Sequence, residues 1–281
     1  MLGILDYNLT EREFEKFKKL IYEKSGINLT NQKKELLKSR LAKRLRVLDI
    51  TGFSDYYKYL INNDPDGSEL VLMLDCISTN KTGFFRENQH FEYLRNTILP
   101  ELVVNKRAKG EHTFRVWSAG CSSGEEPYTL AIILSEFLNP VVSWDAKILA
   151  TDISTKVLSK AKEGVYEKEK VKTIPPNLLQ KYFEKEADNG TVRFHVKSLL
   201  KNLVVFSRFN LMEDIYPFKR YFDIIFCRNV MIYFDKQTQG KITNKFYEHL
   251  ADGGYFLVGH SESLSGVKTN FHYIRPTIYK K

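Results

Sequence analysis

The sequence is poor in the residues that build disulfide frameworks and thiolate metal sites. It has only three cysteines, Cys76, Cys121 and Cys227, which are widely spaced and form no C-x-x-C pair. An odd, scattered set of thiols argues against both a disulfide framework and a zinc or iron–sulfur centre, so we expect no bound metal. No apolar run reaches the ~18 residues of a membrane span, and residues 1–6 do not begin a secretion signal. We therefore expect a cytoplasmic protein that is neither secreted nor inserted in a membrane.

Two nucleotide-binding motifs are also missing. Neither G-x-G-x-x-G nor G-x-x-x-x-G-K occurs, which disfavours hydride transfer and phosphotransfer. The chain has 281 residues, 43% of them hydrophobic and 27% charged, as is typical of a globular protein with a small and a medium domain. The net charge of +9 indicates a nucleic-acid, membrane-surface or acidic protein partner, or simply a well-solvated surface.

Residues 1–88 predict a basic all-α domain followed by a linker. Thr10 and Glu13 form a capping box, after which apolar residues repeat at helical spacing until Gly26. A second helix is predicted over 31–48, with its leucines on one face and most of its lysines and arginines off that face. Two further helices, about 53–60 and 70–74, flank a turn at 63–67.

Residues 89–281 predict an α/β domain, because from about residue 113 short β-rich runs alternate with helical ones. Helices are predicted at 125–138 and 156–162. The last two of the predicted strands form an antiparallel hairpin at the sheet edge. Residues 163–202 are longer than a crossover needs and predict an inserted β-subdomain, with a helix at 178–183, a turn at 188–190 and a strand at 192–196. The strands of the main sheet are predicted at 113–117, 147–151, 203–206, 222–226, 254–258, 272–275 and 277–280.

Ligands of an open parallel sheet bind beyond the carboxyl ends of its strands. The first strand is followed by a loop in which Gly120 and Gly124 permit close approach of a ligand to the backbone. The helix that follows offers free N–H groups, which suits a ligand carboxylate. Glu125 and Glu126 open this helix, where they either bind a ligand ammonium group or merely complement the helix dipole.

The next two strands also end in polar residues. Asp152 closes the second strand, where an acid commonly binds ribose hydroxyls. Asn210 and Leu211 follow the third strand, where a carboxamide can recognise the adenine edge and an apolar side chain can cover the ring. An Asx turn at Asn210 is the alternative.

The fourth strand runs into the segment 226–235, where class I methyltransferases place the residues nearest the transferred methyl group. The acid-Pro-Pro-aromatic motif of amino-directed nucleic-acid enzymes is missing here, as is the Pro-Cys of cytosine C5 enzymes. Cys227 is interpreted as a small buried residue. Tyr233 either faces a sulfonium or packs in the core.

Four segments together resemble the CheR family of chemotaxis receptor methyltransferases: STNKTGFFRE at 78–87, SGEEPY at 123–128, FDIIFCRNVMIYF at 222–234 and GHSE at 259–262. The resemblance covers nearly the whole chain. It implies a Rossmann-like, mostly parallel seven-stranded sheet behind an all-α domain. It also implies that S-adenosylmethionine is the methyl donor and S-adenosylhomocysteine the product. The implied activity is methyl esterification of glutamate side chains on the cytoplasmic helical region of chemoreceptors, by a monomer that neither binds nucleic acid nor enters the membrane.

The resemblance also implies roles for individual residues. Arg86 and Tyr233 act at the reacting end, where Arg86 orients charged groups and Tyr233 lies close to the methyl group. The basic second helix docks the acidic receptor helices. The turn at 188–190 is shorter than in relatives that hold a receptor peptide there, so we do not expect that tether. The cofactor-binding residues implied are Asn80, Thr82, Arg86, Glu125 or Glu126, Asp152, Asn210, Leu211, Arg228 and Asn229, and those implied for receptor docking are Arg40, Lys43, Arg44 and Arg46.

Two other functions stay open at this point. The positive charge suggests a nucleic-acid methyltransferase, against which stand the missing motif and the single basic helix. A receptor-binding adaptor that has lost turnover is the non-enzyme alternative.

Overall fold

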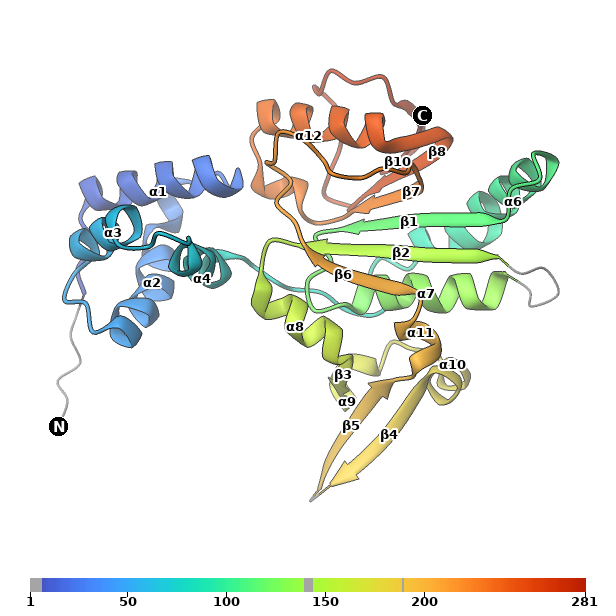
Figure 1. Ribbon diagram of the computed structural model, residues 1–281, viewed down its shortest axis with the longest axis horizontal. Helices are drawn as coiled ribbons and strands as arrows, with labels where there is room; N and C mark the ends of the chain where they lie inside the picture. The colour runs from blue at the N-terminus through green and yellow to red at the C-terminus, as the bar shows by residue number, and fades with distance from the viewer. Residues whose placement is uncertain (1–6, 139–143, 189) are drawn as a thin grey trace.

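The computed structural model describes residues 7–138, 144–188 and 190–281, and it contains two domains with separate hydrophobic cores (Figure 1). Residues 1–6, and Asn189 within the predicted turn at 188–190, lie outside the described residues. None of the helices in the described ranges is both long enough and apolar enough to cross a bilayer.

The N-terminal domain is all-α, as predicted. Its helices are α1 (Glu11–Ser25), α2 (Lys34–Leu48), α3 (Phe53–Asn62) and α4 (Ser68–Ile77), with a 3-10 turn η1 (Asn31–Lys33) before α2. The predicted capping box is confirmed: Glu13 N–H donates to the Thr10 hydroxyl (3.3 Å) and Thr10 N–H donates to the Glu13 carboxylate (2.9 Å). Gly26 ends α1 in the left-handed conformation that glycine adopts without strain.

The linker is followed by a helical segment that was not predicted from the sequence. It comprises α5 (Gln89–Tyr93), the π-helix η2 (Leu94–Ile98) and α6 (Leu99–Ala108). Phe91 of α5 stacks on Phe226 of the sheet, with ring centroids 5.9 Å apart and planes 10° from parallel. The segment therefore covers one face of the sheet and leads from one domain into the other.

The sheet has seven strands in the order β6-β2-β1-β7-β8-β10-β9. Strands β6, β2, β1, β7 and β8 are mutually parallel, and the terminal hairpin of β9 and β10 is antiparallel at the edge, as predicted. The strands are β1 (Thr113–Ala119), β2 (Asp145–Asp152), β6 (Val204–Arg208), β7 (Phe222–Cys227), β8 (Leu250–Val258), β9 (His272–Arg275) and β10 (Ile278–Lys280).

Helices cover both faces of this sheet (Figure 1). Alternate β1 residues point to opposite faces, so Val116 packs with α6 and α7 (Glu125–Phe137), whereas Trp117 packs with α12 (Lys236–His249). Helix α8 (Thr155–Glu163) follows β2. Both crossover helices agree with the sequence prediction to within a residue.

The inserted subdomain is a small sheet of order β3-β5-β4 that projects from the body (Figure 1). The predicted helix 178–183 ends one residue early, because Phe183 already begins β4. Strand β4 escaped prediction since only Phe183 of its six residues is buried, which leaves no apolar alternation. The elements are β3 (Val165–Glu167), α9 (Lys168–Val171), α10 (Pro176–Tyr182), β4 (Phe183–Asp188), β5 (Thr191–Val196) and α11 (Ser198–Lys201).

Polar contacts join the N-terminal domain to the carboxyl end of the sheet. The Tyr22 hydroxyl donates to Asp235 (2.7 Å), and the Thr155 hydroxyl donates to Asp75 (2.9 Å). The backbone N–H of Asn28 donates to the carbonyl of Tyr233 (2.8 Å). These contacts come from α1, the loop after it and α4, so the helical domain lies against the edge where parallel-sheet enzymes bind their ligands.

Candidate active site

A cavity of about 420 Å³ lies between the two domains, at the carboxyl ends of β1, β2 and β7. Three segments form its wall: the loop between α1 and α2, the linker at 77–86 and the strand-end loops. Of the residues expected at the cofactor or the reacting end, the wall contains Asn80, Thr82, Arg86, Glu126, Asp152, Asn210, Leu211, Arg228, Asn229 and Tyr233.

The glycine loop brings backbone close to its neighbours at the cavity wall. Gly120 has φ of +82°, and a Cβ placed on it would lie 2.3 Å from a methyl group of Val230. The N–H groups of Gly120 and Cys121 both donate to the Thr151 carbonyl, at 2.7 and 2.9 Å. Only glycine fits this position without strain, as the sequence pattern indicates.

Asp152 lies at the end of β2 with only 8% of its surface exposed. Its carboxylate accepts hydrogen bonds from the backbone N–H groups of Ser122 (2.8 Å) and Ser154 (2.9 Å). Burial raises the pKa of Asp152, while these hydrogen bonds oppose the rise. Each carboxylate oxygen keeps a lone pair for a further donor, so the group can accept from ligand hydroxyls.

The structure separates the two glutamates that open α7. Glu126 lies in the cavity wall and accepts from the Ser118 hydroxyl (2.7 Å) and from Arg228 (3.2 Å). Burial raises its pKa, against the effect of Arg228. Glu125 is fully buried outside the wall, where it accepts from Ser123 (2.7 Å) and Lys170 (3.3 Å). Glu126 is therefore the one placed to meet a ligand ammonium group.

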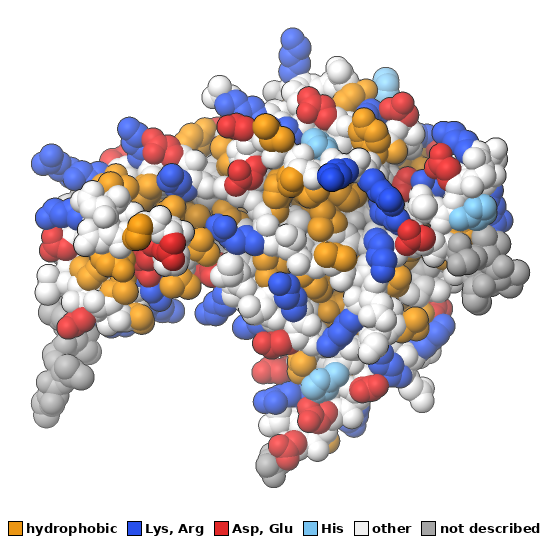
Figure 2. All heavy atoms as spheres, in the orientation of Figure 1, with side chains coloured by type: hydrophobic (Ala, Val, Ile, Leu, Met, Phe, Trp, Pro, Cys, Tyr) orange, Lys and Arg blue, Asp and Glu red, His pale blue; other side chains and the backbone are white. Residues whose placement is uncertain are grey.

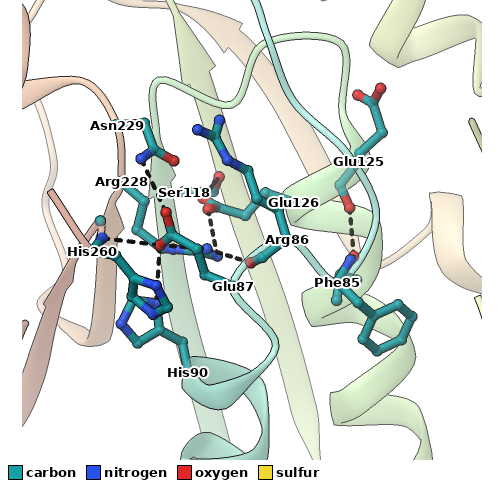
Figure 3. Close-up of polar contacts among 12 residues, drawn as sticks. Phe85, Arg86, Glu87, His90, Ser118, Glu125, Glu126, Arg228, Asn229 and His260 are labelled. Atoms are coloured by element: carbon teal, nitrogen blue, oxygen red, sulfur yellow. Dashed lines mark hydrogen bonds and ion pairs between the residues drawn. The ribbon is translucent and has the colours of Figure 1, made fainter. Parts of the chain in front are cut away.

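Arg228 is the centre of a buried ion-pair network (Figure 3). Its guanidinium contacts Glu126, donates to Glu87 (3.0 Å) and to the Arg86 carbonyl, and lies 5.0 Å from the centroid of the Phe91 ring. With two carboxylates beside it, this cation is already paired. Its place in the wall is compatible with a ligand contact, but it cannot attract an acidic substrate as a free charge would.

Two carboxylates that were given no role from sequence hold Asn229. Glu87 accepts from its side-chain amide (3.1 Å), and Glu262 accepts from its backbone N–H (2.7 Å). Asn229 has φ of +60°, a conformation that such hydrogen bonds help to fix. Both glutamates fall within the segments 78–87 and 259–262 that suggested the family. Their place in those segments was the signal by which a functional role could have been predicted from sequence.

The linker residues Arg86 and Asn80, which both line the cavity, make different hydrogen bonds. Arg86 donates from its guanidinium to the Lys81 carbonyl (2.7 Å), and Figure 3 shows that guanidinium pointing away from the Glu87 network. Asn80 donates to the Ser78 hydroxyl (3.1 Å), and its carbonyl accepts from Ser122 in the glycine loop (3.2 Å). The linker is thus bonded to the loop that follows β1.

Asn210 adopts the Asx turn that was the alternative for it. Its side-chain oxygen accepts from Met212 N–H (3.1 Å), while its amide donates to the Lys24 carbonyl of α1 (2.7 Å). The carboxamide therefore already joins the two domains. Leu211 is buried in the wall, and Tyr233, in the 3-10 turn η3 (Met231–Tyr233), is half-buried there.

The basic face of α2 is smaller than predicted. Lys43 and Arg46 are exposed, whereas Arg40 donates to the carbonyls of Ile77 and Ser78 in the linker. Arg44 turns inward and forms a two-point ion pair with Glu69, at 2.8 and 2.5 Å, where only 15% of its side chain and 5% of that of Glu69 are exposed. The charge of Arg44 is thus already paired inside the domain, and its docking role stays a prediction.

The cavity suits S-adenosylmethionine. Its volume lies within the ~300–1,000 Å³ usual for small-molecule sites. Carboxylates at Glu126 and Asp152 match an ammonium group and a pair of ribose hydroxyls, while Ile153, Phe209 and Leu211 supply apolar wall for a purine. Gly120, which has no side chain, contributes backbone to the wall where a ligand would lie against the loop after β1.

Comparison with known proteins agrees with this geometry. Residues 80–280 match the family described as CheR methyltransferase, SAM binding domain, and residues 12–78 match CheR methyltransferase, all-alpha domain. The chain is 44% identical to the chemotaxis protein methyltransferase of Borreliella burgdorferi (99% of this chain, 96% of the relative). It is 38% identical to that of Escherichia coli (96% and 91%) and 34% identical to chemotaxis protein methyltransferase 2 of Pseudomonas aeruginosa (99% and 96%). The chain therefore belongs to the CheR methyltransferase family, and S-adenosylmethionine is its cofactor.

Proposed function

We propose that this protein is a protein-glutamate O-methyltransferase that esterifies glutamate side chains on the cytoplasmic helical region of chemoreceptors. We also propose that it acts as a monomer in the cytoplasm. The observation that carries the proposal is the composition of the cavity wall. Both carboxylates in that wall are already hydrogen-bonded, and none of the described residues lining it is a histidine.

This wall suits an acceptor that needs no deprotonation. A glutamate side chain has an ordinary pKa near ~4.3 and is already anionic at neutral pH. An amine or an alcohol would need a general base within hydrogen-bond reach. Glu126 and Asp152 are instead held in place by their donors, in positions where they bind the cofactor. A carboxylate acceptor is therefore the nucleophile that this site serves best.

The bound cofactor supplies a methyl group on a sulfonium, which is an activated leaving group. The task of the chain is to align this methyl group with the incoming carboxylate and to exclude water, and such orientation supplies up to ~7–11 kcal/mol. Glu126 binds the ammonium group, Asp152 binds the ribose, and Tyr233 lies at the reacting end. The α1–α2 loop closes the cavity from the side of the helical domain.

Arg86 is the cation best placed to orient the acceptor carboxylate. Its guanidinium bonds only to the Lys81 carbonyl among the described residues, whereas Arg228 is paired with two carboxylates. We expect Arg86→Ala to lower kcat/KM for receptor at least tenfold, the scale of one charge-assisted hydrogen bond (about 1.5–3 kcal/mol). Wild-type turnover and wild-type cofactor affinity in this variant would contradict the assignment.

The chemistry of the product tests the proposed activity. The protein would be incubated with tritium-labelled S-adenosylmethionine and a receptor cytoplasmic fragment. Carboxyl methyl esters release volatile tritiated methanol in mild base, while N-methyl groups do not. A fragment with its acceptor glutamates changed to glutamine is the control. Base-stable label, or equal label on the control fragment, would refute glutamate esterification, and no label at all would indicate an adaptor without turnover.

Receptor docking is proposed for the exposed part of α2. Lys43→Glu reverses a charge at an exposed position, and we expect it to raise the receptor KM several-fold at low salt. Cofactor affinity should not change, because Lys43 does not line the cavity. Lys109→Glu, at the end of α6 far from α2 in Figure 1, makes the same charge change as a control. An equal rise in KM in both variants would refute a focused docking surface.

A further inference from the structure

Behind the cavity wall, three side chains with metal-binding atoms converge. Glu87 comes from the linker, His90 from α5 and His260 from the loop after β8, and one ligand atom of each lies within 4.8 Å of the others. Figure 3 shows both imidazole rings beneath the Glu87 carboxylate, on the side away from Asn229. None of the three lines the cavity, so the cluster is separate from the cofactor site.

The hydrogen bonds of His90 determine which of its ring nitrogens carries the proton. The Thr277 hydroxyl donates its proton to the Pro276 carbonyl (2.6 Å). The same hydroxyl oxygen lies 2.6 Å from His90 Nε2, and with its own proton on the Pro276 carbonyl it accepts from Nε2–H. With the proton on Nε2, His90 Nδ1 presents a lone pair.

This lone pair faces another acceptor. Nδ1 lies 3.5 Å from a Glu87 carboxylate oxygen, and within the described parts of the chain it has no hydrogen-bond donor. The His90 residue is only 2% exposed. Two buried acceptors that face each other without a proton between them are unfavourable, and a cation between them removes the conflict.

The charges nearby are also unbalanced. The side chains of Glu87, Glu126 and Glu262 are at most 14% exposed, and the buried cation that contacts the first two is Arg228. Arg275, the other guanidinium close to His90, is exposed over the Tyr93 ring. Glu87 therefore shares one buried guanidinium with a second carboxylate, and a cation beside Glu87 would add positive charge to this buried group.

In departure from the expectation of no bound metal that the cysteines suggested, we propose that Glu87, His90 and His260 form a Zn²⁺ site that fixes the back of the active-site wall. Two imidazoles and one carboxylate, with a fourth position open to solvent, are a ligand set that zinc accepts. Bonds of about 2.0–2.1 Å in a tetrahedron separate neighbouring ligand atoms by roughly 3.3–3.4 Å, close to the 3.5 Å between His90 and Glu87. His260 is exposed and lies against His90, with ring centroids 4.8 Å apart, so a side-chain rotation completes the set.

The Thr277 contact would then be the outer-shell hydrogen bond that orients a metal-binding histidine. Glu87 also holds Arg228 and Asn229, both of which line the cavity. A metal on Glu87 would therefore restrain two wall residues without touching the cofactor.

The experiment measures zinc binding to the full-length protein. The chain is stripped with EDTA, and Zn²⁺ is titrated in competition with a chromophoric chelator. We expect one equivalent to bind. His260→Ala should weaken binding more than roughly tenfold. Because His260 is exposed, this variant should keep the wild-type circular dichroism spectrum and melting temperature without metal. Co²⁺ should give the visible absorption of a tetrahedral site without a thiolate band.

His195→Ala is the matched control. His195 is an exposed imidazole whose Nε2 lies 2.6 Å from Glu186 on the inserted subdomain, so it offers another histidine–carboxylate pair. This variant should bind zinc like the wild type. Equal affinity of the wild-type and His260→Ala proteins would overturn the proposal, as would loss of the bound equivalent in His195→Ala or no binding at all.

Discussion

The buried ion pair of Arg44 gives the sharpest prediction, because its neighbour on α2, Lys43, is exposed. Arg44 contacts both oxygens of Glu69, and Tyr56 donates to one of them (2.7 Å). Arg44→Ala would leave a Glu69 carboxylate, only 5% exposed, with the Tyr56 hydroxyl as its remaining donor among the described residues. Removal of one partner of a buried pair costs about 3–5 kcal/mol. Since 15% of Arg44 is exposed, we expect a value near the lower end, about 3 kcal/mol.

Thermal unfolding measures this cost. In a domain of ~60–100 residues, 1 kcal/mol lowers Tm by about 4–8 °C, so Arg44→Ala should lower the Tm of the helical domain by roughly 12 °C or more. Lys43→Ala is the matched control, and as an exposed substitution it should change the free energy of unfolding by less than about 0.5 kcal/mol. Combining Arg44→Met with Glu69→Leu removes both charges and should recover most of the loss.

Two results would refute this reasoning. One is a Tm for Arg44→Ala that matches that of Lys43→Ala. The other is a double variant no more stable than Arg44→Ala, which would mean that the stranded carboxylate is not the cause. The comparison also decides how receptor assays are interpreted: a higher receptor KM in Arg44 variants would reflect loss of the folded helical domain, whereas the same change in Lys43 variants would reflect docking.

Three further predictions concern the cavity. Gly120→Ala should weaken S-adenosylhomocysteine binding at least tenfold, measured by calorimetry, because the new methyl group would lie 2.3 Å from a methyl group of Val230. Adding Val230→Ala should restore part of the affinity. If the second substitution restores none, the steric explanation is excluded. Tyr233→Phe should lower kcat a few-fold with cofactor affinity kept, and unchanged kinetics would assign Tyr233 to packing. Burial raises the pKa values of Asp152 and Glu126, so affinity for the cationic cofactor should be full above these raised values and should fall on acidification at a higher pH than for ordinary carboxylates. In Asp152→Asn the part of this pH dependence that is due to Asp152 should vanish. An unchanged pH profile of cofactor affinity in that variant would contradict the role of Asp152.

Much of the fold follows from local patterns in the sequence. The start of helix α1 is encoded by the capping box of Thr10 and Glu13, and its end by Gly26. The central strands of the parallel sheet are largely buried on both faces and appear as mostly apolar runs, as in β7, where all six residues are buried. Strand β4, with its exposed charged residues, lacks such a pattern and was not predicted. The helices between residues 89 and 108 were also not predicted, although Phe91, Leu94, Ile98 and Leu102 recur there at helical spacing.

The features of the candidate site also divide into those that the sequence predicts and those that depend on the tertiary structure. Parallel strands carry their end residues to one edge, so the sequence alone determined that the glycine loop, Asp152 and the segment with Tyr233 would meet there. Only the tertiary structure decided that Glu126 lines the cavity while Glu125 turns away, that Asn210 is bonded to α1, and that Arg44 is paired inside its domain. The physical reason is that a repeat or a cap is encoded within a few neighbouring residues. The partner of a charge, by contrast, lies on another element, such as Glu69 on α4 for Arg44, and its position exists only once the chain has packed.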